Sequence, residues 1–102
     1  MTLVKTLFEI EKEIKDYIDR VGGPYQAWYV GISSTPRDRL FKDHGVREKE
    51  DAWIYRMASD ANTARVIEVY FLRFLGTAGG SGGGDIYAKA VYAYRKNEHT
   101  KP

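Results

Sequence analysis

The feature that most constrains the fold of this chain is an alternation of helix and strand patterns, repeated three times within 102 residues. Helices are predicted at 3–21, 35–45 and 59–75, and strands at 25–32, 52–57 and 86–96. A chain of this length forms one domain with a single core. The alternation fits a parallel α/β sheet or a small antiparallel α+β domain, and the order of the elements alone does not choose between them.

Apolar spacing and capping signals set the expected helix boundaries. Apolar residues recur at three- and four-residue steps over 3–21, which is typical of an amphipathic helix, and Gly22 follows it. Thr35 precedes Pro36, and Asp38 lies three residues after the threonine. This arrangement predicts a capping box at the start of the second helix.

We expect a single domain over 1–102, with a leading helix at 1–21 and a core at 25–96. The glycine-rich stretch 76–85 follows a helix and lacks the Gly-Lys-Ser/Thr ending of a phosphate-binding loop. It is therefore predicted to be a flexible connector. The tail at 97–102 is expected to be loose.

Composition excludes several classes of protein. The chain has no cysteine, which rules out disulfides and cysteine-based zinc sites. No apolar run approaches the roughly 20 residues that span a bilayer, and no signal-peptide pattern opens the chain, so no membrane partner and a cytoplasmic location are expected. A net charge of +2 is too small to indicate nucleic-acid binding by itself.

Glu68 is the first candidate for a functional residue. Its neighbours at helical spacing are mostly apolar, and an acid in an apolar stripe is costly unless it has a partner. Two interpretations stay open. The carboxylate pairs with Arg65 at the edge of the stripe, or it lies at the floor of a cleft as a ligand for Mg²⁺, which needs only one or two protein carboxylates.

Cations gather on the helix that follows the Gly31 turn. Arg37 and Arg39 open this helix, where they can clamp a phosphate together with the helix N-terminus, and Lys42 extends the same predicted nucleic-acid-binding set. The alternative for each arginine is a surface ion pair, such as Arg39 with Asp43 four residues on.

These residues form a recognisable constellation. Tyr29 lies in a "YVG" strand end, Arg39 follows ten residues later, His44 closes the next helix, and Glu68 lies in an "A-x-x-x-E" helix. This order and spacing, from 28 to 75, resembles the GIY-YIG endonuclease superfamily. Histidine here follows the arginine by five residues instead of the usual four, and the family's late asparagine has no counterpart near Gly76.

The family's first strand, with its own tyrosine, also has no counterpart upstream of Tyr29. The chain nevertheless contains three strand candidates. We therefore expect 91–95 to take the missing place as a permuted strand beside the "YVG" strand, with Tyr92 or Tyr94 replacing the missing tyrosine.

The resemblance implies an α+β fold with a small, mainly antiparallel three-stranded sheet flanked by helices, here with an extra N-terminal amphipathic helix. It implies cleavage of phosphodiester bonds in nucleic acid, with DNA as the expected partner, and one Mg²⁺ or Mn²⁺ ion held by Glu68. Arg39 would stabilise charge on the phosphate. The implied catalytic residues are Tyr29, Arg39, His44, Glu68 and Tyr92.

Two other functions fit the same sequence. A relative that has lost catalysis would bind nucleic acid without cutting it. An interaction protein would use the leading helix to bind a partner or a second copy of the chain, although the Leu/Ile spacing of that helix equally fits packing onto its own domain.

Overall fold

The computed structural model describes residues 5–80 and 86–102. Its main elements in chain order are α1 (Leu7–Val21), β1 (Trp28–Ser33), α2 (Pro36–Asp38), β2 (Trp53–Met57), α3 (Ala61–Tyr70) and β3 (Ala90–Arg95). Short turns extend three of them: a 3₁₀ turn at Tyr25–Ala27 precedes β1, and π-helical turns at Arg39–Asp43 and Phe71–Leu75 continue α2 and α3.

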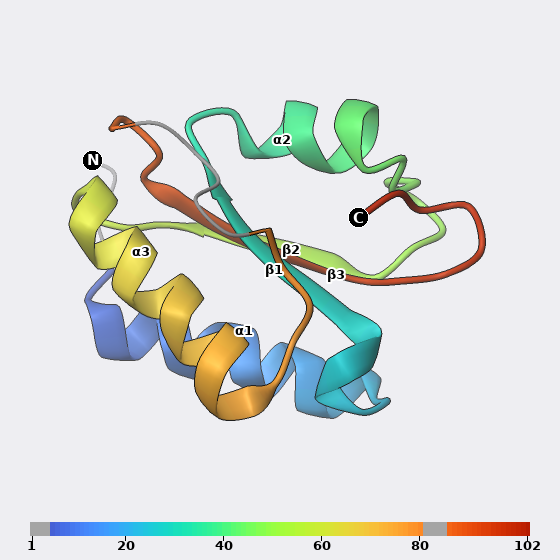
Figure 1. Ribbon diagram of the computed structural model, residues 1–102, viewed down its shortest axis with the longest axis horizontal. Helices are drawn as coiled ribbons and strands as arrows, with labels where there is room; N and C mark the ends of the chain where they lie inside the picture. The colour runs from blue at the N-terminus through green and yellow to red at the C-terminus, as the bar shows by residue number, and fades with distance from the viewer. Residues whose placement is uncertain (1–4, 81–85) are drawn as a thin grey trace.

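The last strand of the chain is the central strand of the sheet. The order is β1-β3-β2, and both pairings are antiparallel (Figure 1). The expected α+β fold with a three-stranded antiparallel sheet is confirmed, and so is the pairing of the last strand with the first. In this register Tyr29 lies opposite Tyr94, and Gly31 lies opposite Tyr92.

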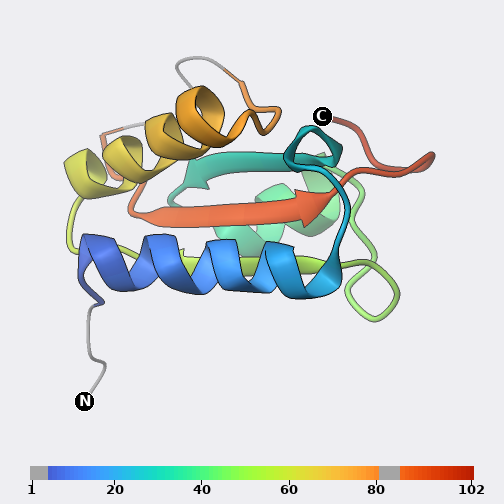
Figure 2. The same cartoon turned by 90° about the horizontal axis from the view of Figure 1, so that it is seen from below.

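Helices cover both faces of the sheet. α1 and α3 lie side by side on one face, and α2 lies on the other (Figures 1 and 2). Side chains alternate between faces along a strand, so each strand contributes to both layers. The α1–α3 layer holds the larger core, with Ile10, Ile14, Ile18, Trp28, Val30, Ile67, Phe71, Val91 and Ala93 among its buried members. The α2 layer holds Tyr29, Leu40, Val46, Tyr92 and Tyr94.

The helix starts differ from the sequence prediction. α1 begins at Leu7, where Thr6 and Glu9 form a reciprocal capping box, and the predicted start at residue 3 lies outside the described residues. The capping box predicted at Thr35 is wrong, because its side chain makes no capping bond. Instead the Ser33 hydroxyl accepts the Thr35 N–H at 2.9 Å, which turns the backbone away from capping geometry.

The glycine-rich stretch is described only in part. Ala78 bridges to the free edge of β1, with the Ala78 N–H donating to Trp28 O at 2.8 Å and the Val30 N–H donating to Ala78 O at 2.9 Å. The rest of the predicted flexible connector, 81–85, lies outside the described residues. β3 begins at Ala90, later than the predicted 86, because the preceding residues form a turn.

The C-terminal tail is ordered, and the prediction of a loose tail is wrong. The Lys101 N–H donates to His44 O at 2.7 Å, and Thr100 is 8% exposed. The Asn97 side chain accepts the backbone N–H groups of His99 and Thr100, which closes the tail into a turn. No helix in the described part of the chain is long and apolar enough to cross a bilayer.

Candidate functional site

Three tyrosines form the floor of the candidate site, on the sheet face beneath α2. The ring of Tyr29 stacks on that of Tyr94 with 5.2 Å between centroids, and lies 6.3 Å from that of Tyr92. The antiparallel register produces this arrangement, since neighbouring strands place these residues on the same face. All three side chains are buried, and the Tyr92 ring is 1% exposed.

His44 lies against this floor and is only 4% exposed. Its Nε2 lies 2.7 Å from the Tyr92 hydroxyl, and its Nδ1 lies 2.7 Å from the Lys101 carbonyl oxygen and 3.1 Å from the Tyr94 hydroxyl. A carbonyl oxygen only accepts hydrogen bonds, so Nδ1 carries the proton and the Tyr92 hydroxyl donates to Nε2. Burial lowers the pKa of His44, and the Arg39 charge lowers it further, which favours the neutral ring.

Arg39 faces the same hydroxyl groups from the π-helical turn. Its guanidinium interacts with the Tyr92 hydroxyl and with Tyr29, and it also pairs with Asp43 at 3.3 Å. The Arg39–Asp43 surface pair considered from the sequence therefore forms. Arg39 nevertheless still interacts with Tyr92 and Tyr29. The guanidinium carries a permanent positive charge with several donors, as a phosphate-binding group requires.

Glu68 approaches from the opposite helix, α3, and is 4% exposed. Burial raises the pKa of this carboxyl, and the Arg65 charge only partly offsets the rise. Within residues 5–80 and 86–102 the carboxylate accepts no hydrogen bond and forms no salt bridge, so the predicted ion pair with Arg65 is not observed there. Its negative charge acts on Tyr92, which places the two groups within electrostatic range of one another.

Tyr92 is the common member of these contacts. Burial raises the pKa of its hydroxyl to about 12, Tyr29 and Glu68 add to the rise, and Arg39 opposes it. The hydroxyl therefore keeps its proton at neutral pH and donates a hydrogen bond to His44 Nε2. A cation bound at Glu68 would lower this pKa together with Arg39.

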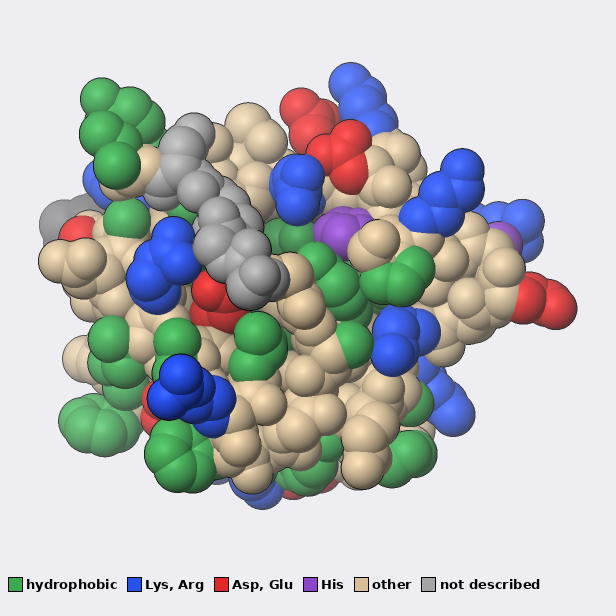
Figure 3. All heavy atoms as spheres, viewed as in Figure 1, with side chains coloured by type: hydrophobic (Ala, Val, Ile, Leu, Met, Phe, Trp, Pro, Cys, Tyr) green, Lys and Arg blue, Asp and Glu red, His purple; other side chains and the backbone are tan. Residues whose placement is uncertain are grey.

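The structure thus groups Tyr29, Arg39, His44, Tyr92 and Tyr94, and the Glu68 charge acts on Tyr92 in this group. On the face between α2 and α3, acidic, basic and histidine side chains lie close together (Figure 3). The other two predicted cations point elsewhere. Arg37 pairs with Glu48 at 2.6 Å, and Lys42 lies 3.7 Å from Asp38 on the helix surface.

Sequence reasoning missed the Lys101 carbonyl as a partner of His44. A main-chain acceptor leaves no signal in side-chain patterns, and the tail offered only the turn-forming Asn97 as a clue. Tyr94 was named only as an alternative to Tyr92, and the structure places both residues against the histidine.

A metal site in this region would depend on one carboxylate. No group of three or more potential metal ligands occurs among the described residues. Mg²⁺ does not need such a group, because water and phosphate oxygens fill most of its six positions. A buried carboxylate that has no hydrogen-bond or salt-bridge partner in the described part of the chain fits that requirement, and Glu68 is the residue that would hold the ion.

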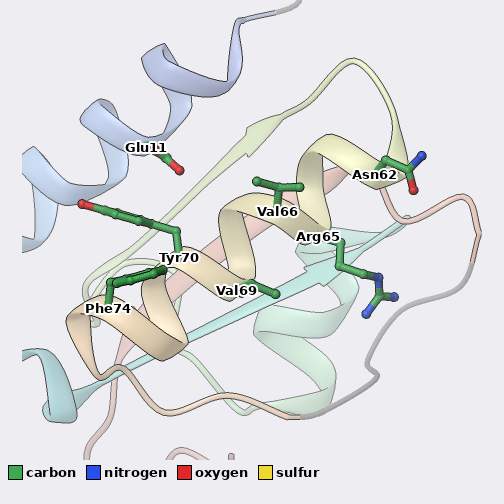
Figure 4. A pocket seen from close by; sticks show the side chains of 7 residues that line it. All are labelled: Glu11, Asn62, Arg65, Val66, Val69, Tyr70 and Phe74. Atoms are coloured by element: carbon green, nitrogen blue, oxygen red, sulfur yellow. The ribbon is translucent and has the colours of Figure 1, made fainter.

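A second feature lies in the α1–α3 layer, on the sheet face opposite α2. It is an apolar groove of about 470 Å³. Figure 4 shows that its lining side chains come from α1 and α3 with its extension. It is lined by Glu11, Asn62, Arg65, Val66, Val69, Tyr70 and Phe74. Phe74 is 76% exposed and Val66 is 53% exposed, so this face carries unusual apolar surface.

The comparisons with known proteins add no relative to these observations. No protein-family model, no curated protein and no solved structure matches this chain.

Proposed function

We propose that the protein is a nuclease that hydrolyses phosphodiester bonds in nucleic acid, with DNA as the expected substrate and Mg²⁺ or Mn²⁺ as cofactor. In this proposal it is a divergent, permuted member of the GIY-YIG endonuclease superfamily, acting in the cytoplasm. The observation that carries the proposal is a buried carboxylate, Glu68, with no hydrogen-bond or salt-bridge partner in 5–80 and 86–102, within electrostatic range of Tyr92 in the Tyr92, His44 and Arg39 cluster.

Each part of the cluster suits one part of phosphodiester hydrolysis. The ion, when bound, supplies Lewis-acid polarisation of the phosphate and acidifies water. Arg39 places a fixed positive charge where the phosphoryl oxygens gain negative charge. Tyr29 lies beside it and offers a hydroxyl to the same oxygens or to water.

The Tyr92–His44 pair supplies a path for the proton. As the water oxygen bonds to phosphorus, the water proton passes to the Tyr92 oxygen while the Tyr92 proton passes to His44 Nε2. The bond to the leaving oxygen breaks, and that oxygen takes a proton from solvent. The short contact of 2.7 Å and the neutral state of the buried histidine support this direction of transfer.

Substrate binding in this proposal uses the cations of the α2 region. Arg37 and Lys42 flank Arg39 along the chain, and each is paired with an acid, Glu48 or Asp38, that it would have to leave to reach a phosphate. Phosphates must compete with those acids, so binding should be weak and should fall steeply with salt.

The test is cleavage of supercoiled plasmid and of labelled single- and double-stranded DNA and RNA, with Mg²⁺, Mn²⁺ or chelator. Wild type should cut in a metal-dependent way, and Glu68→Ala should not. The matched control is Glu98→Ala, which removes an exposed carboxylate in the tail. No cleavage with salt-dependent binding would instead identify a non-cutting nucleic-acid-binding domain.

A second candidate function, self-association, is favoured by the α1–α3 groove. The apolar face of α1 is buried in the protein's own core through Ile10, Ile14 and Ile18. A partner would therefore bind at the groove beside this helix. Glu11 lines the groove from α1, and Val66, Val69 and Phe74 line it from α3 and its extension. A second copy that packs the same face against this one would bury Phe74, which is 76% exposed.

Sedimentation velocity at several protein concentrations tests this candidate. A concentration-dependent dimer that Phe74→Ser abolishes would support it. A monomer at all concentrations would rule out self-association. Neither result bears on cleavage.

A further inference from the structure

The C-terminal strap, defined here as Asn97–Pro102, is attached to His44 at two points. The Lys101 N–H donates to the His44 carbonyl at 2.7 Å, and the Lys101 carbonyl accepts from His44 Nδ1 at 2.7 Å. The same residue therefore holds both the backbone and the ring of the histidine.

A second set of bonds fastens the strap to the connection before β2. Asp51 Oδ1 accepts the Asn97 side-chain N–H at 3.0 Å, and Asp51 Oδ2 lies 2.6 Å from His99 Nε2. The same carboxylate accepts the Arg47 backbone N–H at 2.8 Å. Bonds from these partners hold the pKa of Asp51 below its usual value, although burial opposes them.

The strap also fits closely against the turn after the histidine. Gly45 has φ of +72°, and a Cβ there would lie 3.2 Å from the His99 carbonyl oxygen. Because Gly45 has no side chain, the His99 carbonyl of the strap can approach the turn closely. The turn and the strap therefore both contribute to the close fit.

We propose that the strap is a positioning element, in which the Lys101 carbonyl fixes His44 as the Nδ1–H tautomer with Nε2 free to receive the Tyr92 proton. This inference rests on the proposed nuclease function. A histidine that acts as a base needs its other nitrogen held by an acceptor.

The carbonyl is the group that decides the tautomer. The Tyr94 hydroxyl also lies near Nδ1, at 3.1 Å, but a hydroxyl can donate or accept and fixes neither state. With the strap removed, Tyr94 could donate to an unprotonated Nδ1. Nε2 would then carry the proton and could no longer accept the one from Tyr92.

The experiment compares wild type with a chain shortened after Asn97, with Asp51→Asn, and with Glu98→Ala as the matched control. Selective ¹⁵N labelling of histidine gives the protonation of each ring nitrogen of His44 by NMR, whether or not the protein cuts. Cleavage kinetics are measured in parallel, and thermal unfolding shows which variants fold.

The expected result is a protonated Nδ1 and an unprotonated Nε2 in wild type and Glu98→Ala, and a mixed or reversed pattern in the shortened chain. Asp51→Asn should give a partial change. The kcat should fall roughly ten- to a hundredfold in the shortened chain with little change in KM, because the base is misplaced while binding is intact.

A shortened chain that folds and keeps the wild-type ring pattern would overturn the positioning role. If the shortened chain does not fold, the protonation of the His44 ring nitrogens in Asp51→Asn is the test instead. A wild-type pattern in that variant would likewise overturn the positioning role. If wild type cuts nothing, the proposed function fails on its own result. The ring nitrogens then still report whether the strap holds the tautomer.

Discussion

The Tyr92 ring occupies the space that a side chain at Gly31 would need. A Cβ built on Gly31 would lie 2.5 Å from the Tyr92 hydroxyl oxygen and 2.6 Å from its Cζ. The two residues face each other across the β1–β3 pair. The glycine at the end of the "YVG" stretch therefore makes room for the tyrosine that contacts His44.

Gly31→Ala should destabilise the fold by about 1–3 kcal/mol, because Tyr92 is fully buried and hydrogen-bonded and has nowhere to move. Urea unfolding measures this cost. The control is the same change in a Tyr92→Ala background, where most of the clash is gone. An equal cost in both backgrounds would show that the glycine is needed for another reason.

Glu68→Gln should stabilise the protein while abolishing cleavage. Burial raises the carboxyl pKa, so ionisation of Glu68 in the folded state costs stability at neutral pH. Removing the charge should add on the order of 1 kcal/mol, or about 4–8 °C in Tm for a domain of this size. The gain should vanish below about pH 4, where the carboxyl is protonated in both the folded and unfolded states. A loss of stability at pH 7 would show that the Glu68 carboxylate makes a stabilising interaction beyond those seen in residues 5–80 and 86–102.

Excess Mg²⁺ should raise the Tm of wild type and leave Glu68→Gln unchanged. An ion that binds only the folded state stabilises it by mass action, and Glu68 is the carboxylate that would hold the ion. The matched control is Glu11→Gln, which removes another carboxyl whose pKa burial raises, on the α1 side of the groove. The Glu11→Gln variant should show the same rise in Tm with Mg²⁺ as wild type. If that rise disappears in Glu11→Gln, the metal binds at a different site.

The sequence predicted the floor of the site better than its surroundings. Tyrosines two residues apart in a strand must share a face, so Tyr92 and Tyr94 could be placed beside Tyr29 once the strands were paired. The strap could not be predicted, because its key contact is a main-chain carbonyl at Lys101. The capping box was assigned to Thr35, where the Ser33 hydroxyl competes for the backbone.

Arg39→Ala should reduce cleavage by about 10²–10³ while Arg39→Lys recovers only part of the loss. The guanidinium is half-exposed and lies beside the Tyr92 and Tyr29 hydroxyls, so the fold should survive its removal. Lysine keeps the charge but loses the planar pair of donors. Arg20→Ala, on the surface of α1, is the control for general loss of positive charge. Cleavage that falls equally in both alanine variants would argue against a local role for Arg39.

His44 should make stability fall as pH drops from 7 towards 5. Burial lowers its pKa in the folded state, so between the folded value and the unfolded value near 6.5 the unfolded chain binds more protons. Its contribution is therefore complete above about pH 6.5 and is lost as the pH falls, with a slope of up to about 1.4 kcal/mol per pH unit. Asp51 adds acid sensitivity at lower pH, because its pKa is also below the usual value. Urea unfolding of wild type and His44→Gln across this range separates the two groups, since the variant should lose the slope near pH 6 and keep the one near pH 4. A His44→Gln curve that still falls between pH 7 and 5 would show that another group titrates there.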